Sequence, residues 1–451
     1  MKASKRLSLR LQIRNFKNAF FQIGELPFEN LISDSLIKSL RRSGNGNDSI
    51  FTPLITLKTF LLQILNENAS CKEAVSTVFM ERVTNGYEAN SINTGGYCKA
   101  RQRLPLPILK EMVMSSGQVL HQQAADDWLW KGFRVALVDG TTLLMPDTKD
   151  NQASYPQQST QKPGLGFPIL RMVGLLSLTS KSCLGYETAP YKGKGTGETS
   201  LFSKLISLLD QNDLLLGDRY YASYAIMCLL TLQGTSFIFK QSSNVKTDFK
   251  KGTYLGAKDH ILQYKKPARK PVWMSKEAYL EMPNELFVRE FSVNGVIYVS
   301  SLLKIKTYPK KELAGLYELR WDVELDFRTI KTNMRMEMLR CKTAEMVNKE
   351  IAVNLLAYNL VCSNIAHSAY VHKKKPRHIS FMAAVQIMHS FVGVCVVMSS
   401  KMLEKLLPLL LKAISYTEVG KRKRPSQPRV LKRRPKAFPL MTKPRSDYAI
   451  S

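Results

Sequence analysis

The spacing of apolar and polar positions divides the chain into a helical beginning, a middle that mixes strands with helices, and a helical end. Residues 54–65 (LITLKTFLLQIL) are almost wholly apolar and predict a buried helix. Ser70 and Glu73 have the spacing of a capping box, in which a serine caps a helix and a glutamate reaches back to it. We therefore expect residues 1–125 to form a helical N-terminal domain.

The middle of the chain alternates between short apolar runs and segments with helical spacing. Strand-like runs cover residues 134–139, 169–178, 183–189, 213–218 and 236–240, and helical spacing covers residues 199–211 and 221–233. Alternating strands and helices predict an α/β sheet, in which ligands usually bind at the strand ends. Residues 126–240 are thus expected to form the first part of an α/β domain.

Residues 241–306 have the composition of a β-rich insertion, with many Lys, Tyr, Val and Phe residues. Two apolar runs, 286–291 and 296–299, flank the dipeptide Asn294-Gly295. Because Asn-Gly readily adopts the backbone conformation of a two-residue turn, these runs predict a hairpin.

The last third of the chain is expected to be helical. Helical spacing begins at Lys310 and continues to about residue 416, apart from a break at 373–378. We expect three parts here: a helix that closes the α/β domain at 307–345, a helical region with a possible role in dimerisation at 346–420, and a basic tail at 421–451.

Basic residues exceed acidic ones by a wide margin. The 66 Lys and Arg residues against 36 Asp and Glu give a formal net charge of +30. Residues 421–451 hold eleven basic residues and one acid, so they account for +10 and leave +20 (30 − 10) for the rest of the chain. Such an excess favours a polyanionic partner over an ordinary metabolic role. Nucleic acid is the first choice, because Lys and Arg release counterions from phosphates.

Other classes of protein fit the sequence less well. No run of 18 apolar residues is long enough to span a membrane, and the N-terminus lacks the apolar core of a signal peptide. The seven cysteines include no Cys-x-x-Cys pair, and the six histidines include no His-Glu-x-x-His pattern. Neither a disulfide framework nor a zinc ribbon is therefore expected, and the reducing cytoplasm is the expected location, with no membrane partner.

Two carboxylates occupy equivalent places in the predicted sheet. Asp139 and Asp218 each end a strand-like run and are 79 residues apart (218 − 139). If the two strands are adjacent, both side chains could enter one cleft, where a divalent cation would relieve their repulsion. Mg²⁺ prefers carboxylate, water and phosphate oxygens, and two such ions can clamp the attacking and leaving oxygens of a phosphodiester. The plainer alternative is that each aspartate is a turn residue or a helix cap.

A third carboxylate lies on residues 317–331, a segment with helical spacing and no Gly or Pro. Four polar side chains would fall within an arc of roughly 60° on such a helix: Tyr317, Arg320, Glu324 and Lys331. A DNA backbone along this face would satisfy the three donors and leave Glu324 to hold a metal ion. The alternative is an exposed polar stripe with ion pairs inside the helix.

This spacing resembles a known signature. Tyr317-x2-Arg320-x3-Glu324-x6-Lys331 matches the YREK signature of DDE transposases of the insertion-sequence-4 family. Residues 138–142 (Val-Asp-Gly-Thr-Thr) resemble the first acidic motif of that family, and residues 216–221 (Leu-Gly-Asp-Arg-Tyr-Tyr) resemble its second. The likeness extends from about Tyr97 to the Arg- and Pro-rich tail, which is most of the chain.

The resemblance implies an α/β fold with an RNase H-like catalytic core and a β-rich insertion before the last acidic residue. A helical N-terminal domain and a helical C-terminal region with a basic tail would flank this core. Asp139, Asp218 and Glu324 would be the catalytic residues and would hold two Mg²⁺ ions, for which Mn²⁺ can substitute. The other residues of the signature would contact DNA phosphates: Tyr317, Arg320 and Lys331.

Three further residues are candidates for DNA contacts. Trp273 lies in the predicted insertion, where related transposases stack an aromatic ring on a flipped base, a contact worth about 1–3 kcal/mol. The alternative for Trp273 is a place in the core of a small β-domain. Arg101 and Arg103 lie on a short basic segment after Gly95-Gly96. Such a helix could read a major groove or could present a solvated basic face.

As the resemblance implies, the expected activity is cut-and-paste DNA transposition. A homodimer would bind the terminal inverted repeats of an insertion sequence in double-stranded DNA and hydrolyse phosphodiesters at its ends. Each 3′-hydroxyl would then be joined to target DNA after the ends have passed through a hairpin form. The protein would act in the cytoplasm, at the bacterial nucleoid. Two alternatives stay open: a nuclease with the same metal core but no strand transfer, and a transposase-derived protein that only binds DNA.

Overall fold

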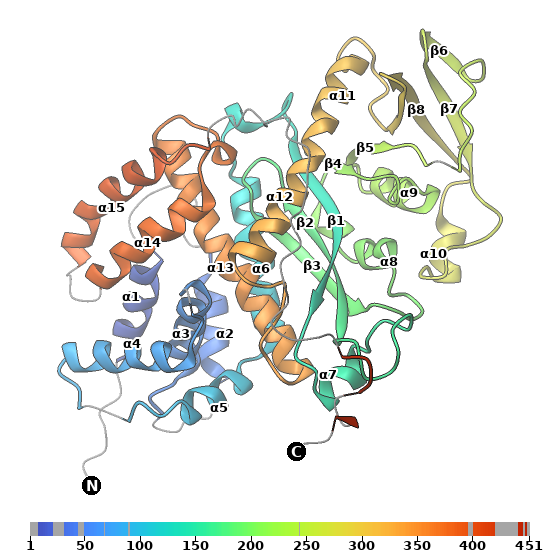
Figure 1. The fold of residues 1–451 in the computed structure, drawn as a ribbon. Coiled ribbons are helices and arrows are strands. Elements are labelled where there is room, and N and C mark those ends of the chain that lie inside the picture. The colour runs from blue at the N-terminus through green and yellow to red at the C-terminus, as the bar shows by residue number, and fades with distance from the viewer. Residues whose placement is uncertain are drawn as a thin grey trace.

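The computed structural model describes residues 8–20, 31–43, 49–66, 68–88, 91–242, 244–395, 400–419, 441–444 and 447–448. Within these ranges the protein is a mixed α/β structure, in which one large sheet carries helices on both faces and further helices gather beside it (Figure 1). The predicted basic tail, 421–451, lies almost wholly outside the described residues. No helix of the described part is long and apolar enough to cross a membrane.

Nine strands form a single sheet in the order β3-β2-β1-β4-β5-β9-β8-β7-β6. β1 runs parallel to β4 and β4 to β5, while all other neighbours are antiparallel. The strands are β1 Arg134–Leu144, β2 Ile169–Ser177, β3 Cys183–Pro190, β4 Asp213–Gly217, β5 Ser236–Lys240, β6 Thr253–Gly256, β7 Asp259–Lys265, β8 Glu285–Val293 and β9 Val296–Ser300. The five strand-like runs predicted between residues 134 and 240 are confirmed, and β1 continues beyond its predicted end.

The strands of the predicted insertion continue the same sheet. β9 pairs with β5, and β8, β7 and β6 follow in turn. The predicted hairpin joins β8 to β9, and its turn residues Asn294 and Gly295 have positive φ angles of 50° and 78°, as a tight two-residue turn requires. A short helix, α10 (Lys276–Glu281), lies between β7 and β8. The insertion is therefore tied to the centre of the sheet by backbone hydrogen bonds.

Alternate side chains of the central strands enter two separate cores. Val135 and Leu137 face the core that contains α6, α11, α12 and α13, whereas Ala136 and Val138 face the core that contains α8 and α9. Because side chains alternate along a strand, Asp139 continues the series of Val135 and Leu137. The helices over the two faces are α6 Leu106–Gln122, α8 Glu198–Ser203, α9 Tyr224–Leu232, α11 Lys310–Glu318, α12 Asp322–Arg328 and α13 Ala344–Val371, and α7 Lys149–Ser154 follows β1.

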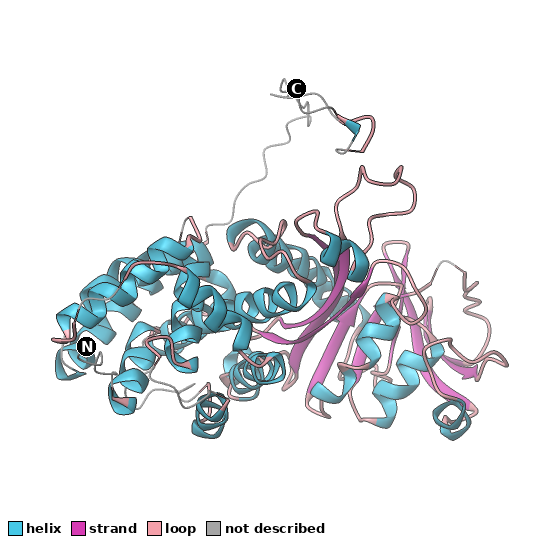
Figure 2. Ribbon diagram, turned by 90° about the horizontal axis from the view of Figure 1, so that it is seen from below, coloured by secondary structure: helices cyan, strands magenta, loops and turns pink. Residues whose placement is uncertain are grey.

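The helices beside the sheet come from both ends of the chain, and Figure 2 shows them gathered on one side of the strands. They are α1 Leu9–Ala19, α2 Asp34–Arg42, α3 Pro53–Leu65, α4 Cys71–Thr84, α5 Gly95–Arg103, α14 Phe381–Cys395 and α15 Ser400–Ser415. The nearly buried α13 connects them to the sheet, since it packs against α3, α6, α14 and α15. The predicted helix at 54–65 is confirmed as α3, and Ser70 caps α4 by accepting hydrogen bonds from the N–H groups of Lys72 and Glu73.

Three predicted helical segments differ from the structure. Residues 199–211 form only the short α8 and a 3₁₀ turn at Ile206–Leu208. The expected regular helix at 317–331 is divided by a 3₁₀ turn, Leu319–Trp321, and ends in a π-helical turn, Thr329–Asn333. Residues 334–343 are not helical, because this segment lies along the end of β1 and exchanges backbone hydrogen bonds of 3.1 and 2.8 Å with Leu144. Tertiary contacts therefore override the helical spacing.

A buried ion pair fastens α12 to the sheet and to the C-terminal helices. Asp326 is 1% exposed and accepts hydrogen bonds of 2.7 and 3.1 Å from Arg377, which lies just before α14. Arg377 also donates to the carbonyl oxygens of Ser177, at 3.0 Å, and Leu178, at 2.7 Å, at the end of β2. One guanidinium thus satisfies buried acceptors on two elements, which would otherwise lack partners.

Replacing Arg377 with Met should destabilise the protein by about 3–5 kcal/mol, because Asp326 would be left as a buried, unpaired carboxylate. Chemical denaturation followed by far-UV circular dichroism measures the change. Asp322→Asn is the matched control: Asp322 lies 3.9 Å from Arg377 and its side chain is 28% exposed, so its loss should cost less than about 1 kcal/mol. Equal stabilities for the Arg377→Met variant and the parent chain would contradict the proposed anchor.

Candidate active site

Asp139 lies on β1, and Asp218 directly follows β4, the parallel neighbour of β1. β1 and β4 pair in register from Arg134↔Asp213 to Leu137↔Leu216, an offset of 79 residues (213 − 134). Asp218 lies just beyond the last paired residue of β4 and is close enough to Asp139 to act on it electrostatically. The register is locked at its first pair, because Arg134 Nε donates a 2.8 Å hydrogen bond to Asp213 Oδ1.

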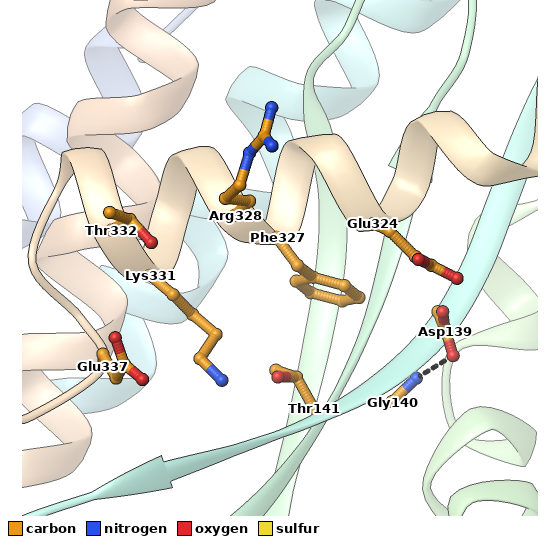
Figure 3. Close-up of a pocket in the computed structure, with 9 residues that line it drawn as sticks. All are labelled: Asp139, Gly140, Thr141, Glu324, Phe327, Arg328, Lys331, Thr332 and Glu337. Atoms are coloured by element: carbon orange, nitrogen blue, oxygen red, sulfur yellow. Dashed lines mark hydrogen bonds between the residues drawn. The ribbon is translucent and has the colours of Figure 1, made fainter. Parts of the chain in front are cut away.

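Glu324 approaches these acids from α12, which lies close against the sheet. Gly174 in β2 is the strand partner of Asp139, and the ring of Phe327 covers it, so that a Cβ at position 174 would lie 3.1 Å from Phe327 Cζ. Phe327 follows Glu324 by three residues, and Figure 3 shows the carboxylates of Glu324 and Asp139 facing each other. The sequence analysis missed Gly174, although a glycine inside a buried strand signals a close approach.

The guanidinium of Arg320 lies beside both of the facing acids. Its nitrogens are 3.7 Å from Asp139 Oδ2 and 3.6 Å from Glu324 Oε1. The Arg320 side chain is 11% exposed, and the guanidinium lies over the ring of Trp321 at 5.1 Å from its centroid. A fixed positive charge therefore offsets part of the repulsion between the two carboxylates.

A pocket of about 300 Å³ opens between α12 and β1. Figure 3 shows Glu324 and Asp139 together on one side of it, Lys331 pointing into it, and Arg328 pointing away. The residues that line it are Asp139, Gly140, Thr141, Glu324, Phe327, Arg328, Lys331, Thr332 and Glu337. A pocket with neighbouring acidic and basic parts can hold a phosphodiester beside bound cations.

Burial raises the pKa of Asp139 to about 6. The pKa of about 6 is the net result of several effects. The Asp218 carboxylate also raises this pKa, whereas Arg320 lowers it. The backbone N–H of Gly140, which donates to Asp139 Oδ1 at 2.8 Å, lowers it as well. A carboxylate that is costly to leave charged gains more than an exposed one from a bound cation.

The donor set around this pocket suits Mg²⁺ or Mn²⁺. Asp139, Asp218 and Glu324 offer carboxylate oxygens only, and these are the ligands that hard divalent cations prefer. Across the part of the chain that the structure describes, no three Asp, Glu, His or Cys side chains are close enough together to enclose an ion. Arg320, rather than a shared ion, is in contact with two of the acids. The acids therefore fit divalent cations in their chemistry, and two of them, Asp139 and Glu324, line the pocket.

The other two residues of the predicted signature differ in exposure. Tyr317 is buried, with 8% of its surface exposed, and its ring packs edge-on against Tyr298 at 5.1 Å. Burial raises the pKa of Tyr317 to about 12. Lys331 lines the pocket. The segment thus presents Glu324 and Lys331 to the pocket, while Tyr317 and Arg320 are largely covered.

The remaining predicted DNA contacts do not line this pocket. Trp273 packs, half-buried, against the core that contains α8 and α9. Arg101 lies inside the helical N-terminal part, over the rings of Phe60, at 4.9 Å, and Tyr97, at 5.0 Å. Arg103, at the end of α5, is exposed, so it presents its charge more openly than Arg101.

Replacing Asp139 with Asn should stabilise the metal-free protein by about 1–2 kcal/mol at pH 8, because the variant no longer buries a charge. The ordinary pKa of this carboxyl is 3.8, and its value in the folded chain is about 6. Between these values the folded chain binds more protons than the unfolded chain, so the stability of the parent chain falls as the pH rises through this window.

The advantage of the Asp139→Asn variant should therefore shrink as the pH falls from 6 to 4. Denaturation in the presence of a chelator, across this range, measures it. Asp127→Asn is the control, since Asp127 is exposed and its replacement should leave stability unchanged at every pH. A difference between Asp139→Asn and the parent that grows in acid would contradict the assignment.

Comparisons with known proteins identify the family of the chain. A family model described as "Transposase DDE domain" matches residues 130–360. "Transposase InsG for insertion sequence element IS4" of Escherichia coli (strain K12) is 26% identical over 361 residues, which are 78% of this chain and 79% of that protein. "Putative transposase InsZ" of the same organism is 25% identical over 149 residues, 32% of this chain and 48% of that protein.

A solved structure also aligns with most of the chain. The cryo-EM structure of a piggyBac transposase synaptic complex with hairpin DNA covers 88% of this chain and 85% of its own, with a TM-score of 0.41 and 10% identity. The family model spans more than half of the chain and includes Asp139, Asp218 and Glu324. The resemblance first seen in the YREK spacing is confirmed: the chain belongs to the DDE transposases, in the IS4 family, whose activity is DNA transposition.

Proposed function

We propose that the chain is a cut-and-paste transposase that binds the terminal inverted repeats of an insertion sequence, hydrolyses the phosphodiesters at its ends and joins the freed 3′-hydroxyls to target DNA. The observation that supports this proposal is the approach of Asp139 and Glu324, from two distant segments, to one pocket. Asp218 directly follows β4, the parallel neighbour of β1, and acts electrostatically on Asp139. Acids that repel one another are not brought together for stability alone, so a function that uses their combined charge is the better explanation.

We also infer that the catalytic core is RNase H-like. The strand order β3-β2-β1-β4-β5, with acids on the central pair β1 and β4, supports this inference. The proposed division is a DNA-binding helical domain at 1–125, a core at 126–240 and 307–345, a β-rich insertion at 241–306, a dimerising helical region at 346–420 and a basic tail at 421–451.

The side chains around the pocket would hold and orient one DNA strand. Asp139, Asp218 and Glu324 would bind two divalent cations, Mg²⁺ with Mn²⁺ as a substitute, which supply charge stabilisation for in-line displacement at phosphorus. Lys331 and Arg320 would bind phosphate oxygens, and Phe327 would form an apolar wall beside the sugar. In the cutting step a water oxygen bonds to phosphorus as the 3′-oxygen leaves with a proton, and in the joining step the 3′-hydroxyl takes the place of that water.

DNA contacts would extend beyond the pocket. The net charge of +30 supports an extended phosphate interface, in which the exposed Arg103 would take part and Tyr317 would assist at the pocket. Trp273 would stack on a base flipped out beside the cut. The reaction would pass through an intermediate with hairpin ends. Because two ends must be cut and joined together, a homodimer on paired ends is the proposed active assembly.

Replacing Glu324 with Gln should lower the rate of metal-dependent cleavage of an element-end duplex by at least a thousandfold, because a cation ligand is lost. Binding of the same duplex should be retained, since the remaining basic surface is unchanged. Glu318→Gln is the matched control, because Glu318 is an exposed glutamate on the same helical segment. A cleavage rate in the Glu324→Gln variant equal to that of the parent protein would contradict the proposed function.

The parent protein should also join the cleaved end to a second DNA molecule. Purified protein, a labelled end duplex and a target plasmid are sufficient for this assay. Cleavage without any joined product would show a nuclease that lacks strand transfer, and binding without cleavage would show a DNA-binding protein only.

Replacing Gly174 with Ala should lower the cleavage rate by about tenfold or more, because the added methyl group pushes Phe327 outward and shifts Glu324 away from Asp139. Binding of the end duplex should not change. Gly315→Ala in α11 is the control, because a Cβ at that position would meet no atom within 4 Å. Equal cleavage rates for the two variants would show that the Gly174 contact does not position Glu324.

A further inference from the structure

Three cysteine thiols gather around the guanidinium of Arg101, far along the chain from the acids of the pocket. Cys71 is the first residue of α4, Cys98 lies in α5, and Cys341 lies shortly before α13. All three are free thiols with partly exposed side chains, and all three act electrostatically on Arg101. This basic residue of α5 therefore faces thiols, which gives it a possible role other than DNA contact.

Two side chains hold Cys71 and Cys98 next to each other. Gln63, on α3, donates a 3.4 Å hydrogen bond to Cys71 Sγ and accepts one of 3.4 Å from Arg101 Nη1. Arg101 Nη2 in turn donates to Cys98 Sγ at 3.6 Å, and the two thiols are hydrogen-bonded to each other. Sulfur atoms in hydrogen-bond contact need only a small movement to reach the length of a disulfide bond, about 2.05 Å.

The third thiol, Cys341, is occupied by Glu350. The backbone N–H of Cys341 donates a 2.9 Å hydrogen bond to Glu350 Oε2, and its thiol is hydrogen-bonded to the same carboxylate. Burial raises the pKa of the Cys341 thiol well above its ordinary value, and Glu350 raises it further. Because a thiol reacts as its thiolate, Cys341 is the least reactive of the three, which leaves Cys71 and Cys98 as the pair.

Arg101 supplies a positive charge beside this pair. Its Nε is buried and has no hydrogen-bond acceptor within the described ranges, so part of its capacity to bind a negative group is unused. Burial raises the pKa of Cys71, whereas Arg101 lowers it. The start of α4 also favours a negative charge, because the helix dipole is positive there. Cys71 is therefore the thiol placed to attack, and its burial slows the attack without preventing it.

We propose that Cys71 and Cys98 are a redox-active pair that forms a reversible disulfide between α4 and α5, with a small-molecule disulfide as the co-reactant. The Cys71 thiolate attacks one sulfur of that molecule and releases its other half as a thiolate, which takes up a proton. The Cys98 thiolate then attacks the mixed disulfide at Cys71 and releases the second half. The two protein thiols lose two electrons and two protons, and the small disulfide is reduced to two thiols.

This bond would hold α5, which carries the exposed Arg103, against the start of α4. Disulfides of proteins in reducing compartments are usually transient or redox-sensing, and a pair that is reduced at rest and closes under oxidation has this behaviour. In a simpler role, Cys71 and Cys98 only pack around Arg101. Each would then react with an oxidant independently of the other.

Equilibration of the full-length protein with mixtures of oxidised and reduced glutathione, followed by alkylation of the remaining thiols and tryptic mapping without reductant, tests the proposal. Trypsin places the two cysteines in different peptides, 59–72 and 83–99, so a disulfide joins these peptides into one species. We expect this linked species to be the major form in excess oxidised glutathione and to disappear when reduced glutathione is restored. Free thiols at both positions, or glutathione adducts without the linked species, would overturn the inference.

Two variants identify the partners. Cys98→Ser should abolish the linked species and leave Cys71 as a mixed disulfide with glutathione. Cys341→Ser is the matched control, because it removes the third thiol near Arg101 but keeps the pair, and it should give the linked species at the same glutathione ratio as the parent. A disulfide between Cys341 and either of the other two cysteines in the parent, or loss of the linked species in Cys341→Ser, would show that the pair is wrongly assigned.

Discussion

The contact between Arg320 and two acids is the interaction on which the arrangement of the pocket depends. Asp139 and Glu324 repel each other, and burial makes the charge of Asp139 more costly. Arg320 lies within 4 Å of both carboxylates. Because Arg320 belongs to the same helical segment as Glu324, that segment carries both the third acid and a positive charge that compensates for it. Cations that bind these carboxylates compete with the guanidinium for the same oxygens. Under the proposed function, metal binding and the release of Arg320 toward a phosphate would therefore be linked.

The surrounding frame holds these groups in place through a few specific contacts. Asp213 accepts a hydrogen bond from Arg134 Nε and lies 3.1 Å from His121 Nε2, which fixes β4 against β1 and α6. On the other side of the pocket, the pair of Asp326 and Arg377 holds α12 on the sheet. Each contact joins segments that are far apart in the sequence, so the geometry of the pocket is a property of the whole fold.

Local patterns were sufficient to predict much of this structure. The strands β1 and β4 and the helix α3 follow from apolar runs. Asp218 directly follows β4 as predicted, whereas Asp139, expected at a strand end, lies inside β1, because this strand continues to Leu144. The helix at 317–331 was predicted as regular because its spacing is helical, whereas docking onto the sheet divides it.

Contacts between distant segments left no such signal. Arg377 lies in a stretch that appears only as a break between helices, and its partner Asp326 is 51 residues away. Glu198 begins a helix whose sequence gives no sign that its carboxylate will pack against Gly140. The roles of Trp273 and Arg103 depend on bound DNA, and they stay predictions.

The pairing of β9 with β5 has a mechanical consequence. Backbone hydrogen bonds run without interruption from β3, through the strands that carry the acids, to β6 at the far edge. A load placed on the outermost strands would therefore be shared with the centre through this ladder. The inserted strands and the strands β1 and β4 thus belong to one continuous sheet.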